Sequence, residues 1–277
     1  KKNKFLPRQR LWYIRAKEVV LSTGSIERPI VFGNNDTPGV ILSSGAKEYM
    51  KIYGVLVGKK PIIFTNNDTA YETAIEFKKN GVNPIILDTR DEFNSEIIED
   101  AKKLNIEIKF NHAVIAAKGY KKVNSASIGK LSKDKKNIEF TENIECDCIC
   151  VSGFWTPSVH LTSQSGNKLK FNEELDAFVP NKSKQNEINV GAANGEFKLQ
   201  STINSGFKAG EEISKKLFDK NQNIQIPNVN EKKYSKHDKF WCVPLPKGKS
   251  YKRFLDFQND VAVSDVEIAL SEGYRSI

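Results

Sequence analysis

The sequence is short of methionine, histidine and cysteine, and it holds no long apolar run. Its 277 residues include one Met, three His and four Cys. No apolar segment approaches the roughly 20 residues that a membrane-spanning helix needs, and the first residues carry no signal-peptide pattern. Four cysteines are too few for a disulfide framework in a chain of this size. We therefore expect reduced thiols, a cytoplasmic protein and no membrane partner.

The scarcity of histidine and cysteine also argues against the common metal and nucleophile sites. The three histidines are His112, His160 and His237. They lie too far apart in the sequence to suggest a Cys–His or Ser–His–Asp set. Cys146, Cys148 and Cys150 hold alternate positions, which would place all three on one face of a strand. Zinc ligands more often stand about two to four residues apart on a turn, so we expect buried core thiols and no metal.

An excess of positive charge is present, but it is spread along the chain. The net charge is +9, from 43 basic and 34 acidic residues. The lysines usually stand beside Glu, Asp or Asn, as in residues 133–137, KDKKN. A nucleic-acid-binding face would gather the charge into a stripe with aromatic side chains in between. The scatter favours a solvated, lysine-rich surface and no nucleic acid as a partner.

The first part of the chain predicts strands and one helix. The chain has no initiator Met and soon enters strand-like sequence, so we expect a piece of a longer chain. A chain of this length holds one large domain or two medium ones. Residues 11–24 predict two short strands, the second ending in Thr-Gly. Residues 42–53 have apolar side chains at helical spacing, and Gly54 predicts the end of that helix.

A strand–helix–strand unit follows. Residues 61–64 form a short apolar run, Pro-Ile-Ile-Phe, which is typical of a parallel strand buried on both faces. Residues 70–79 predict a helix, and residues 84–87 predict a second apolar strand that closes on Asp88. The crossover between the two strands should be right-handed. This order predicts a Rossmann-like unit.

The rest of the chain continues to alternate helices and strands. The pattern predicts, in order, a helix at 96–104, a strand at 106–110, an antiparallel meander over 113–150, a strand at 148–151, a strand at 188–191 and a helix at 202–218. The linker at 221–230 marks a boundary. A last helix is predicted in the tail, starting near Asp265.

The loop after the strand at 61–64 is the first candidate nucleotide site. A dinucleotide fold places G-x-G-x-x-G or A between strand and helix, with an acid about 20 residues further on for the ribose. Ala70 holds the third glycine position and Asp88 the place of the acid, but other residues replace the first two glycines. The candidates are Thr65, Asn66, Asn67, Asp68 and Asp88. Asn tolerates a left-handed turn, yet its side chain would crowd a phosphate, so a binding loop and a vestigial loop both stay open.

Two further segments, 17–24 (KEVVLSTG) and 188–195 (INVGAANG), bracket the inserted unit. In two-dinucleotide flavoproteins, a strand ending in A-T-G and a later strand ending in G-D both return to the first domain beside its dinucleotide. Gly191 and Gly195 would let the backbone approach a ligand, and the next helix would aim its N-terminal end at a phosphate. Asn194 stands near the Asp of that pattern. The first Gly-rich strand–helix unit is expected upstream of the chain.

These patterns predict an α/β protein with two interleaved Rossmann-like dinucleotide-binding domains, as in glutathione reductase, and a short helical C-terminal extension. The predicted division is 1–54 for part of the first domain, 55–150 for the inserted second domain with its meander, 151–220 for the return to the first domain, and 221–277 for the linker and helical extension. Because half of the first domain is expected to lie outside this segment, we expect the isolated segment to be poorly stable.

Several strings resemble the alpha subunit of heterotetrameric sarcosine oxidase. They are RAKEVVLSTGSIERPIVFGNNDTPGV, IFTNNDTAYETA, VSGFWTPSVHLTSQSGNKL, AFVP, VGAANGEFKLQSTINSGFKAG and RFLDFQNDVAVSDVEIALSEGYRS, in order along the chain. The resemblance implies a complex that oxidises sarcosine, forms glycine and hydrogen peroxide, and passes the one-carbon unit to tetrahydrofolate as methylenetetrahydrofolate. It implies NAD in this subunit, FAD in the beta subunit, FMN at their interface, and beta, gamma and delta subunits as partners.

The same resemblance assigns roles to particular residues. It implies an NAD-type site in the first fold lined by Thr23, Gly24, Ser25, Gly191, Ala192, Asn194 and Gly195. The loop at 65–68 resembles the family's own glycine-poor version, which favours the vestigial interpretation. The amine-oxidising flavin belongs to the beta subunit, so no catalytic acid or base is expected here. The tail after Phe240 resembles a helical extension before the folate-binding domain. Only Cys242 remains there, which argues against the iron–sulfur cluster of related dehydrogenases, and Phe154 stands where Gly is expected.

Three other assignments stay open at this point. The chain could be the alpha subunit of a related opine, proline or amine dehydrogenase. It could be a stand-alone NAD(P)H-dependent flavoprotein oxidoreductase, although the C-x-x-C redox pair of the disulfide reductases is absent from the sequence. It could also be a scaffold whose nucleotide is purely structural and is never reduced.

Overall fold

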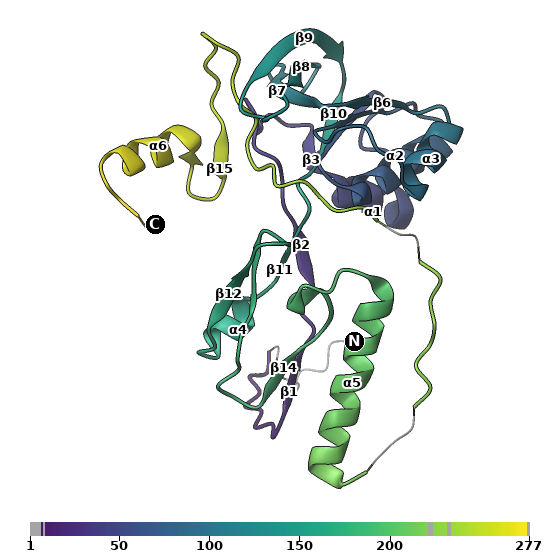
Figure 1. Ribbon diagram of the computed structural model, residues 1–277, viewed down its shortest axis with the longest axis vertical. Helices are drawn as coiled ribbons and strands as arrows, with labels where there is room; N and C mark the ends of the chain where they lie inside the picture. The colour runs from purple at the N-terminus through teal and green to yellow at the C-terminus, as the bar shows by residue number, and fades with distance from the viewer. Residues whose placement is uncertain (1–6, 8, 221–223, 232–233, 276–277) are drawn as a thin grey trace. The chain divides into compact units, whose positions relative to one another are not determined.

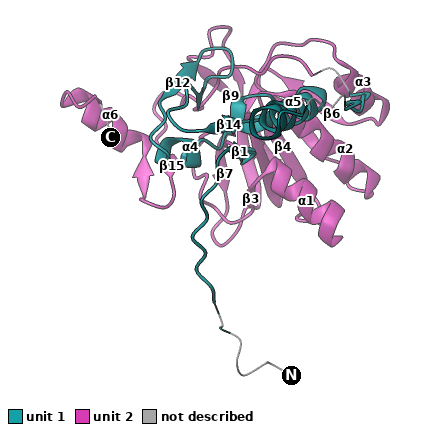
Figure 2. Ribbon diagram, turned by 90° about the horizontal axis from the view of Figure 1, so that it is seen from below, with its two compact units in different colours: residues 1–25, 157–231 teal, residues 26–156, 232–277 magenta. Residues whose placement is uncertain are grey.

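The computed structural model describes residues 7, 9–220, 224–231 and 234–275 (Figure 1). Two compact units make up the chain, and Figure 2 colours them separately. Unit 1 comprises residues 1–25 and 157–231, and unit 2 comprises residues 26–156 and 232–277. The chain enters unit 2 within β2 (Ser25–Glu27) and leaves it within β11 (Trp155–Pro157). Each unit is therefore built from two separate stretches of chain, as an interleaved fold requires.

Unit 2 is organised around a five-stranded parallel sheet with the strand order β3-β10-β4-β5-β6. The strands are β3 (Val40–Leu42), β4 (Pro61–Thr65), β5 (Ile85–Asp88), β6 (Glu107–Phe110) and β10 (Cys148–Ser152). Every residue of β4 and β10 is buried. This burial explains why both strands read as almost continuous apolar runs, because each is covered on both faces.

Helices cover one face of this sheet and an antiparallel meander covers the other (Figure 1). The helices are α1 (Ser43–Tyr53), the short 3-10 helix η1 (Asp68–Ala70), α2 (Tyr71–Lys79) and α3 (Glu96–Lys103). The meander consists of β7 (His112–Lys118), β8 (Ser125–Leu131) and β9 (Ile138–Glu145). Ile62 and Phe64 of β4 face the meander, whereas Ile63 between them packs with the helices. Because successive side chains of a strand point to opposite faces of the sheet, β4 contributes to two separate cores.

The cysteine prediction is half confirmed. Cys146, Cys148 and Cys150 are all buried, with at most 1% of each residue exposed. Cys148 and Cys150 pack on the helix side of the sheet, but Cys146 belongs to the core under the meander. The prediction of one shared face was wrong for Cys146 because β10 begins only at Cys148. Cys146 lies in the connection from β9, where strand alternation does not apply.

Unit 1 contains less regular structure. Its elements are β1 (Val19–Leu21), α4 (His160–Gln164), β12 (Leu169–Asn172), β13 (Ala177–Pro180), β14 (Glu187–Asn189), the 3-10 helix η2 (Gly191–Asn194) and α5 (Leu199–Phe218). β1 and β14 pair in parallel, and β12 and β13 form an antiparallel hairpin. Only β1 forms within residues 11–24, where two strands were predicted. Leu11 is 81% exposed and Tyr13 is 90% exposed, so these side chains are not packed against the described part of the chain.

The boundaries between the two compact units differ from the domain boundaries that we predicted from the sequence. Residues 26–54, predicted to belong to the first domain, lie in unit 2 because β3 pairs with β10. The tail also joins unit 2, through a bridge between Val31 and Cys242. It ends in a small hairpin and a helix, β15 (Phe254–Asp256), β16 (Val261–Ala262) and α6 (Val263–Ser271). The predicted tail helix is thereby confirmed.

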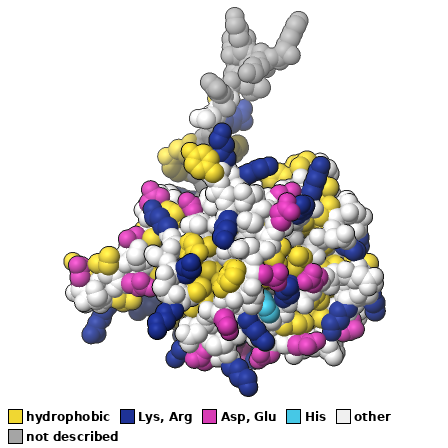
Figure 3. Space-filling view, turned by 90° about the horizontal axis from the view of Figure 1, so that it is seen from above, with side chains coloured by type: hydrophobic (Ala, Val, Ile, Leu, Met, Phe, Trp, Pro, Cys, Tyr) yellow, Lys and Arg dark blue, Asp and Glu magenta, His cyan; other side chains and the backbone are white. Residues whose placement is uncertain are grey.

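Three further properties bear on function: helices that could cross a membrane, groups of metal ligands, and surface charge. Within the described residues, no helix is long and apolar enough to cross a membrane, and no group of three or more His, Cys, Asp and Glu side chains could hold a metal ion. Figure 3 shows basic and acidic side chains interspersed over the face that it draws, with no continuous basic stripe there. The charge on this face follows the scatter predicted from the sequence.

Candidate nucleotide-binding sites

The two sequence segments predicted to return to one domain do meet in unit 1. β1 and β14 are parallel neighbours, with Leu21 in register with Asn189. Both strands run in the same direction, so the residues that follow them, Thr23-Gly24 and 191–195, leave the sheet at the same edge. The carboxyl edge of a parallel sheet is where nucleotides bind in open α/β folds. The prediction that both segments return to one domain agrees with their pairing in unit 1.

Two glycines shape the turn after β14. Gly191 and Gly195 have φ values of 64° and 83°, in the left-handed region that side chains rarely adopt. A Cβ on Gly195 would lie 2.6 Å from the Leu175 side chain, and a Cβ on Gly191 would lie 2.9 Å from that of Thr202. The glycines are therefore required by the turn and its packing. The packing of the turn is thus a second reason for glycine at these positions, beside the predicted one, which was close approach of the backbone to a ligand.

The turn after β1 is fastened to a residue that the sequence did not single out. The Thr23 hydroxyl donates a hydrogen bond to the Ser158 carbonyl oxygen at 2.7 Å, and the Ser158 amide donates to the Gly24 carbonyl oxygen at 2.9 Å. Gly24 has a φ of 73°, and a Cβ built there would meet no atom within 4 Å. The backbone beside Gly24 is thus open, while Thr23 is held by its hydrogen bond to Ser158, which lies just before α4 begins.

The N-terminal end of α5 faces a negative group of the chain itself. The Leu199 amide donates to a carboxylate oxygen of Glu231 at 2.6 Å. The N-terminal end of a helix carries partial positive charge and favours anions. Asn194 is exposed, and its side-chain amide lies 3.5 Å from the Glu196 carboxylate. The remaining candidates, Ser25 and Ala192, are half-buried.

The second candidate site, the loop after β4, has the predicted position but a closed structure. Its residues Thr65, Asn66, Asn67 and Asp68 are at most 1% exposed. The Asn67 side-chain oxygen accepts the Thr69 amide at 3.0 Å, and its amide group donates to Ser152 Oγ at 3.0 Å. Asn67 therefore caps η1 with its own side chain. The predicted strand–loop–helix order is confirmed.

Two buried carboxylates of this site share one buried arginine. Arg90 Nη1 lies 2.8 Å from Asp68 Oδ1, and Arg90 Nη2 lies 2.7 Å from Asp88 Oδ2. The Tyr71 hydroxyl also donates to Asp88, at 2.7 Å. Asp88 thus lies at the end of β5 as predicted, but its oxygens are already bound by protein groups. Sequence reasoning missed Arg90, although it stands only two residues after the predicted ribose acid.

The pKa shifts follow from this arrangement. Burial alone would lower the pKa of the Arg90 guanidinium, but its hydrogen bonds to Asp88 and the charges of Asp88 and Asp68 hold that pKa above its ordinary value. Burial, reinforced by the Asp88 carboxylate, raises the pKa of the Tyr71 hydroxyl. The cluster therefore holds a charged guanidinium between its two carboxylates, with a neutral tyrosine hydroxyl beside them.

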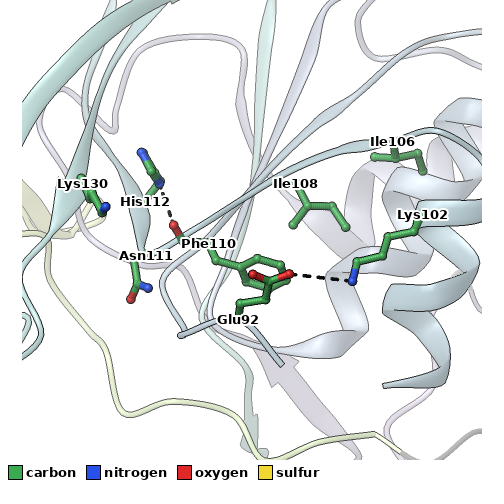
Figure 4. Close-up of a pocket in the computed structure, with 8 residues that line it drawn as sticks. All are labelled: Glu92, Lys102, Ile106, Ile108, Phe110, Asn111, His112 and Lys130. Atoms are coloured by element: carbon green, nitrogen blue, oxygen red, sulfur yellow. Dashed lines mark hydrogen bonds and ion pairs between the residues drawn. The ribbon is translucent and has the colours of Figure 1, made fainter. Parts of the chain in front are cut away.

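A cavity of about 440 Å³ opens beside the edge strand β6 (Figure 4). It is lined by Glu92, Lys102, Ile106, Ile108, Phe110, Asn111, His112 and Lys130. His112 Nδ1 lies 2.7 Å from the Phe110 carbonyl oxygen, which orients the ring locally. None of the candidate nucleotide residues lines this cavity, so it is separate from both predicted sites.

Comparison with known proteins finds relatives along almost the whole chain. The family model for the sarcosine oxidase A3 domain matches residues 250–277. The sarcosine oxidase alpha subunit of Corynebacterium sp. (strain P-1) is 30% identical over 98% of this chain, and that of Rhizobium meliloti (strain 1021) is 32% identical over 98%. The chain is therefore similar to one part of these sarcosine oxidase alpha subunits. It spans 28% and 26% of the lengths of these two relatives.

The solved structures support the fold. Thioredoxin reductase from T. acidophilum superimposes with a TM-score of 0.56 at 19% identity, covering 70% of this chain and 64% of that one. At this identity the likeness concerns the fold, which is the predicted α/β arrangement of two interleaved dinucleotide-binding domains. Within this chain, the match to the sarcosine oxidase A3 domain begins in the tail, at residue 250, before β15.

Proposed function

We propose that this chain is the nucleotide-holding segment of a sarcosine oxidase alpha subunit, with an NAD-type dinucleotide bound in unit 1. The observation that carries the proposal is the similarity to two such subunits along 98% of the chain. On this proposal the complete protein works in a complex with beta, gamma and delta subunits. That complex converts sarcosine, oxygen and tetrahydrofolate to glycine, hydrogen peroxide and methylenetetrahydrofolate, using FAD and FMN.

The unit 1 residues fit a dinucleotide better than the loop of unit 2 does. The open backbone at Gly24 and the turn around Gly195 follow neighbouring parallel strands, and such strand ends are where phosphates and riboses bind. Thr23, Ser25, Ala192 and Asn194 flank these turns with polar or small side chains. An anion at the N-terminal end of α5 would take the place now held by the Glu231 carboxylate.

In this proposal the chain binds and positions, and it supplies no acid or base to amine oxidation. The bound nucleotide would be structural or would exchange hydride with a flavin, and the flavin chemistry would belong to partner subunits. The chain's own contribution would be the rigid turns, since Gly191 and Gly195 fix the backbone around the ligand. An assay of the isolated chain should therefore find no sarcosine oxidation.

The experiment is to purify the full-length subunit with its partners, denature it and identify the released nucleotides by mass spectrometry. We expect NAD from the wild type and no NAD from Gly195→Val, because a β-branched residue is strained at a φ of 83° and its Cβ would lie 2.6 Å from the Leu175 side chain. Gly206→Ala is the matched control, because a Cβ on this glycine of α5 would meet nothing within 4 Å. Release of FAD alone, or of no nucleotide, from the wild-type subunit would refute the proposal.

A further inference from the structure

A stretch of the tail without regular structure lies across the loop of the inserted fold. We call residues 234–240 the strap; in Figure 1 it is the yellow-green segment that runs past α1. The Ser235 amide and hydroxyl each donate a hydrogen bond to the Asp68 carboxylate at 2.8 Å. The Asp238 amide donates to the Asn66 carbonyl oxygen at 3.0 Å, and the Asn66 side chain donates back to the Asp238 carbonyl oxygen at 2.7 Å. These hydrogen bonds, one between main-chain groups and three through the side chains of Asn66 and Asp68, fix the strap on the loop.

Side chains add to these contacts. Arg90 donates to the Ser235 hydroxyl at 2.9 Å, which joins the strap to the buried arginine between the two carboxylates. The His237 ring stacks on Phe154, with ring centroids 3.8 Å apart and planes 6° from parallel. Phe154 has a φ of 84°, in the region that a bulky side chain rarely adopts. A glycine at this position would relieve the backbone but would leave His237 without its stacking partner.

The closed loop offers little to a pyrophosphate. The Asn67 and Thr69 amides, at the N-terminal end of η1, already donate to Thr65 Oγ1 and Asn67 Oδ1. The Asp68 carboxylate stands in the first turn of η1, where the positive end of a helix would otherwise attract a phosphate. A phosphate entering there would meet a like charge in a buried setting. The side chains of Asn66 and Asn67 also fill the space that glycines leave open in a binding loop.

We infer that the strap occupies the dinucleotide cradle of the inserted fold and that this fold holds no dinucleotide. The strand–loop–helix of unit 2 serves to clamp the tail, with Asp68, Arg90 and Asn66 as the clamp. The inference concerns unit 2 alone and does not rest on the proposed function, which places a nucleotide in unit 1. It also accounts for the missing glycines, because the side chains of Thr65 and Asn67 form hydrogen bonds within the loop, which hold Asn66 and Asp68 where they bond the strap.

Hydrogen exchange followed by mass spectrometry or NMR tests the inference in the full-length subunit. The Ser235 and Asp238 amides lie in a stretch without helix or strand, yet each donates to a buried acceptor. We expect both to exchange on the order of 100-fold more slowly than amides of an open loop. Asp68→Ala should remove the protection at Ser235. Asp256→Ala is the matched control, since that carboxylate accepts hydrogen bonds from Gln258 and Asn259 within its own hairpin, and it should leave the strap amides unchanged.

The same readout decides whether a dinucleotide can enter the cradle. A nucleotide bound there must displace the strap, so the Ser235 and Asp238 amides would exchange faster when NAD⁺ or NADP⁺ is added at millimolar concentration. We expect no change with either nucleotide. Faster exchange in the strap on adding nucleotide, or fast exchange in the wild type without it, would overturn the inference. If the subunit releases no NAD while the strap amides stay protected, the proposed function fails and the inference stands.

Discussion

The buried cluster around Arg90 gives a prediction that can be worked out in magnitude. Arg90 is 6% exposed, and its partners Asp68 and Asp88 are 1% and 0% exposed. Arg90→Met keeps the apolar length of the side chain but leaves both carboxylates without their cation. Removing one partner of a buried ion pair costs about 3–5 kcal/mol, because an uncompensated charge stays behind. We expect a loss of this size in the free energy of unfolding of unit 2 at neutral pH.

The assay is urea unfolding followed by tryptophan fluorescence. The chain has three tryptophans, of which Trp155 and Trp241 lie in unit 2. A Trp12→Phe background therefore confines the signal to that unit. Lys102→Met is the matched control, because the ion pairs of Lys102 with Glu99 at 3.5 Å and with Glu92 at 4.0 Å are exposed. Exposed pairs contribute at most about 1 kcal/mol, so this variant should stay close to the wild type.

The origin of the loss can be tested with the carboxylates themselves. Adding Asp68→Asn and Asp88→Asn to Arg90→Met removes the two uncompensated charges, so the triple variant should recover most of the loss at neutral pH. A penalty below about 1 kcal/mol for Arg90→Met, or no recovery in the triple variant, would refute the reasoning.

Three further predictions concern the core. In native protein at pH 8, Ellman's reagent should react with Cys242 before the other three cysteines of this chain, because Cys146, Cys148 and Cys150 are buried. Burial raises the pKa of the Cys242 thiol too, but it raises that of Cys146 to about 12; reaction of a buried thiol before Cys242 would contradict this. Burial raises the pKa of Glu27, so the wild type should lose thermal stability relative to Glu27→Gln as pH rises from about 4 to 8, and a pH-independent difference in Tm would count against it. Gly33→Ala should cost about 1–3 kcal/mol, since the new Cβ would lie 2.7 Å from Tyr251 Cβ and 2.9 Å from the Ile115 carbonyl oxygen. The control Gly206→Ala, in open space on α5, should leave stability unchanged or raise it slightly in the same denaturation assay.

The inserted fold was the part most readily predicted from the sequence, because its signals are local. The apolar runs of β4 and β5 indicated strands buried on both faces, and Gly54 marked the end of α1 with a φ of 64°. Each of these elements is decided by a few consecutive residues. The fold class followed from their order along the chain, together with the two bracketing strands in unit 1.

Long-range contacts could not be predicted in the same way. Ser158 and Arg90 matter through partners that only the folded chain brings near, and the strap meets a loop about 170 residues earlier in the sequence. The boundary after residue 54 was misplaced because β3 belongs to its sheet through hydrogen bonds to β10, which lies more than one hundred residues later. Cys146 was assigned to the wrong core because the start of β10 depends on pairing with β4.

The most direct test of the account locates the nucleotide within the chain. The purified complex would be photolabelled with an azido-adenine analogue of NAD⁺, digested, and mapped by peptide mass spectrometry, with excess NAD⁺ as competitor. The account predicts label on unit 1 peptides near Thr23-Gly24 or near residues 191–195, lost with the competitor. Specific label on the peptide that holds Thr65–Asp68 or Asp88 would contradict it, because it would show a dinucleotide in the cradle that the strap is inferred to fill.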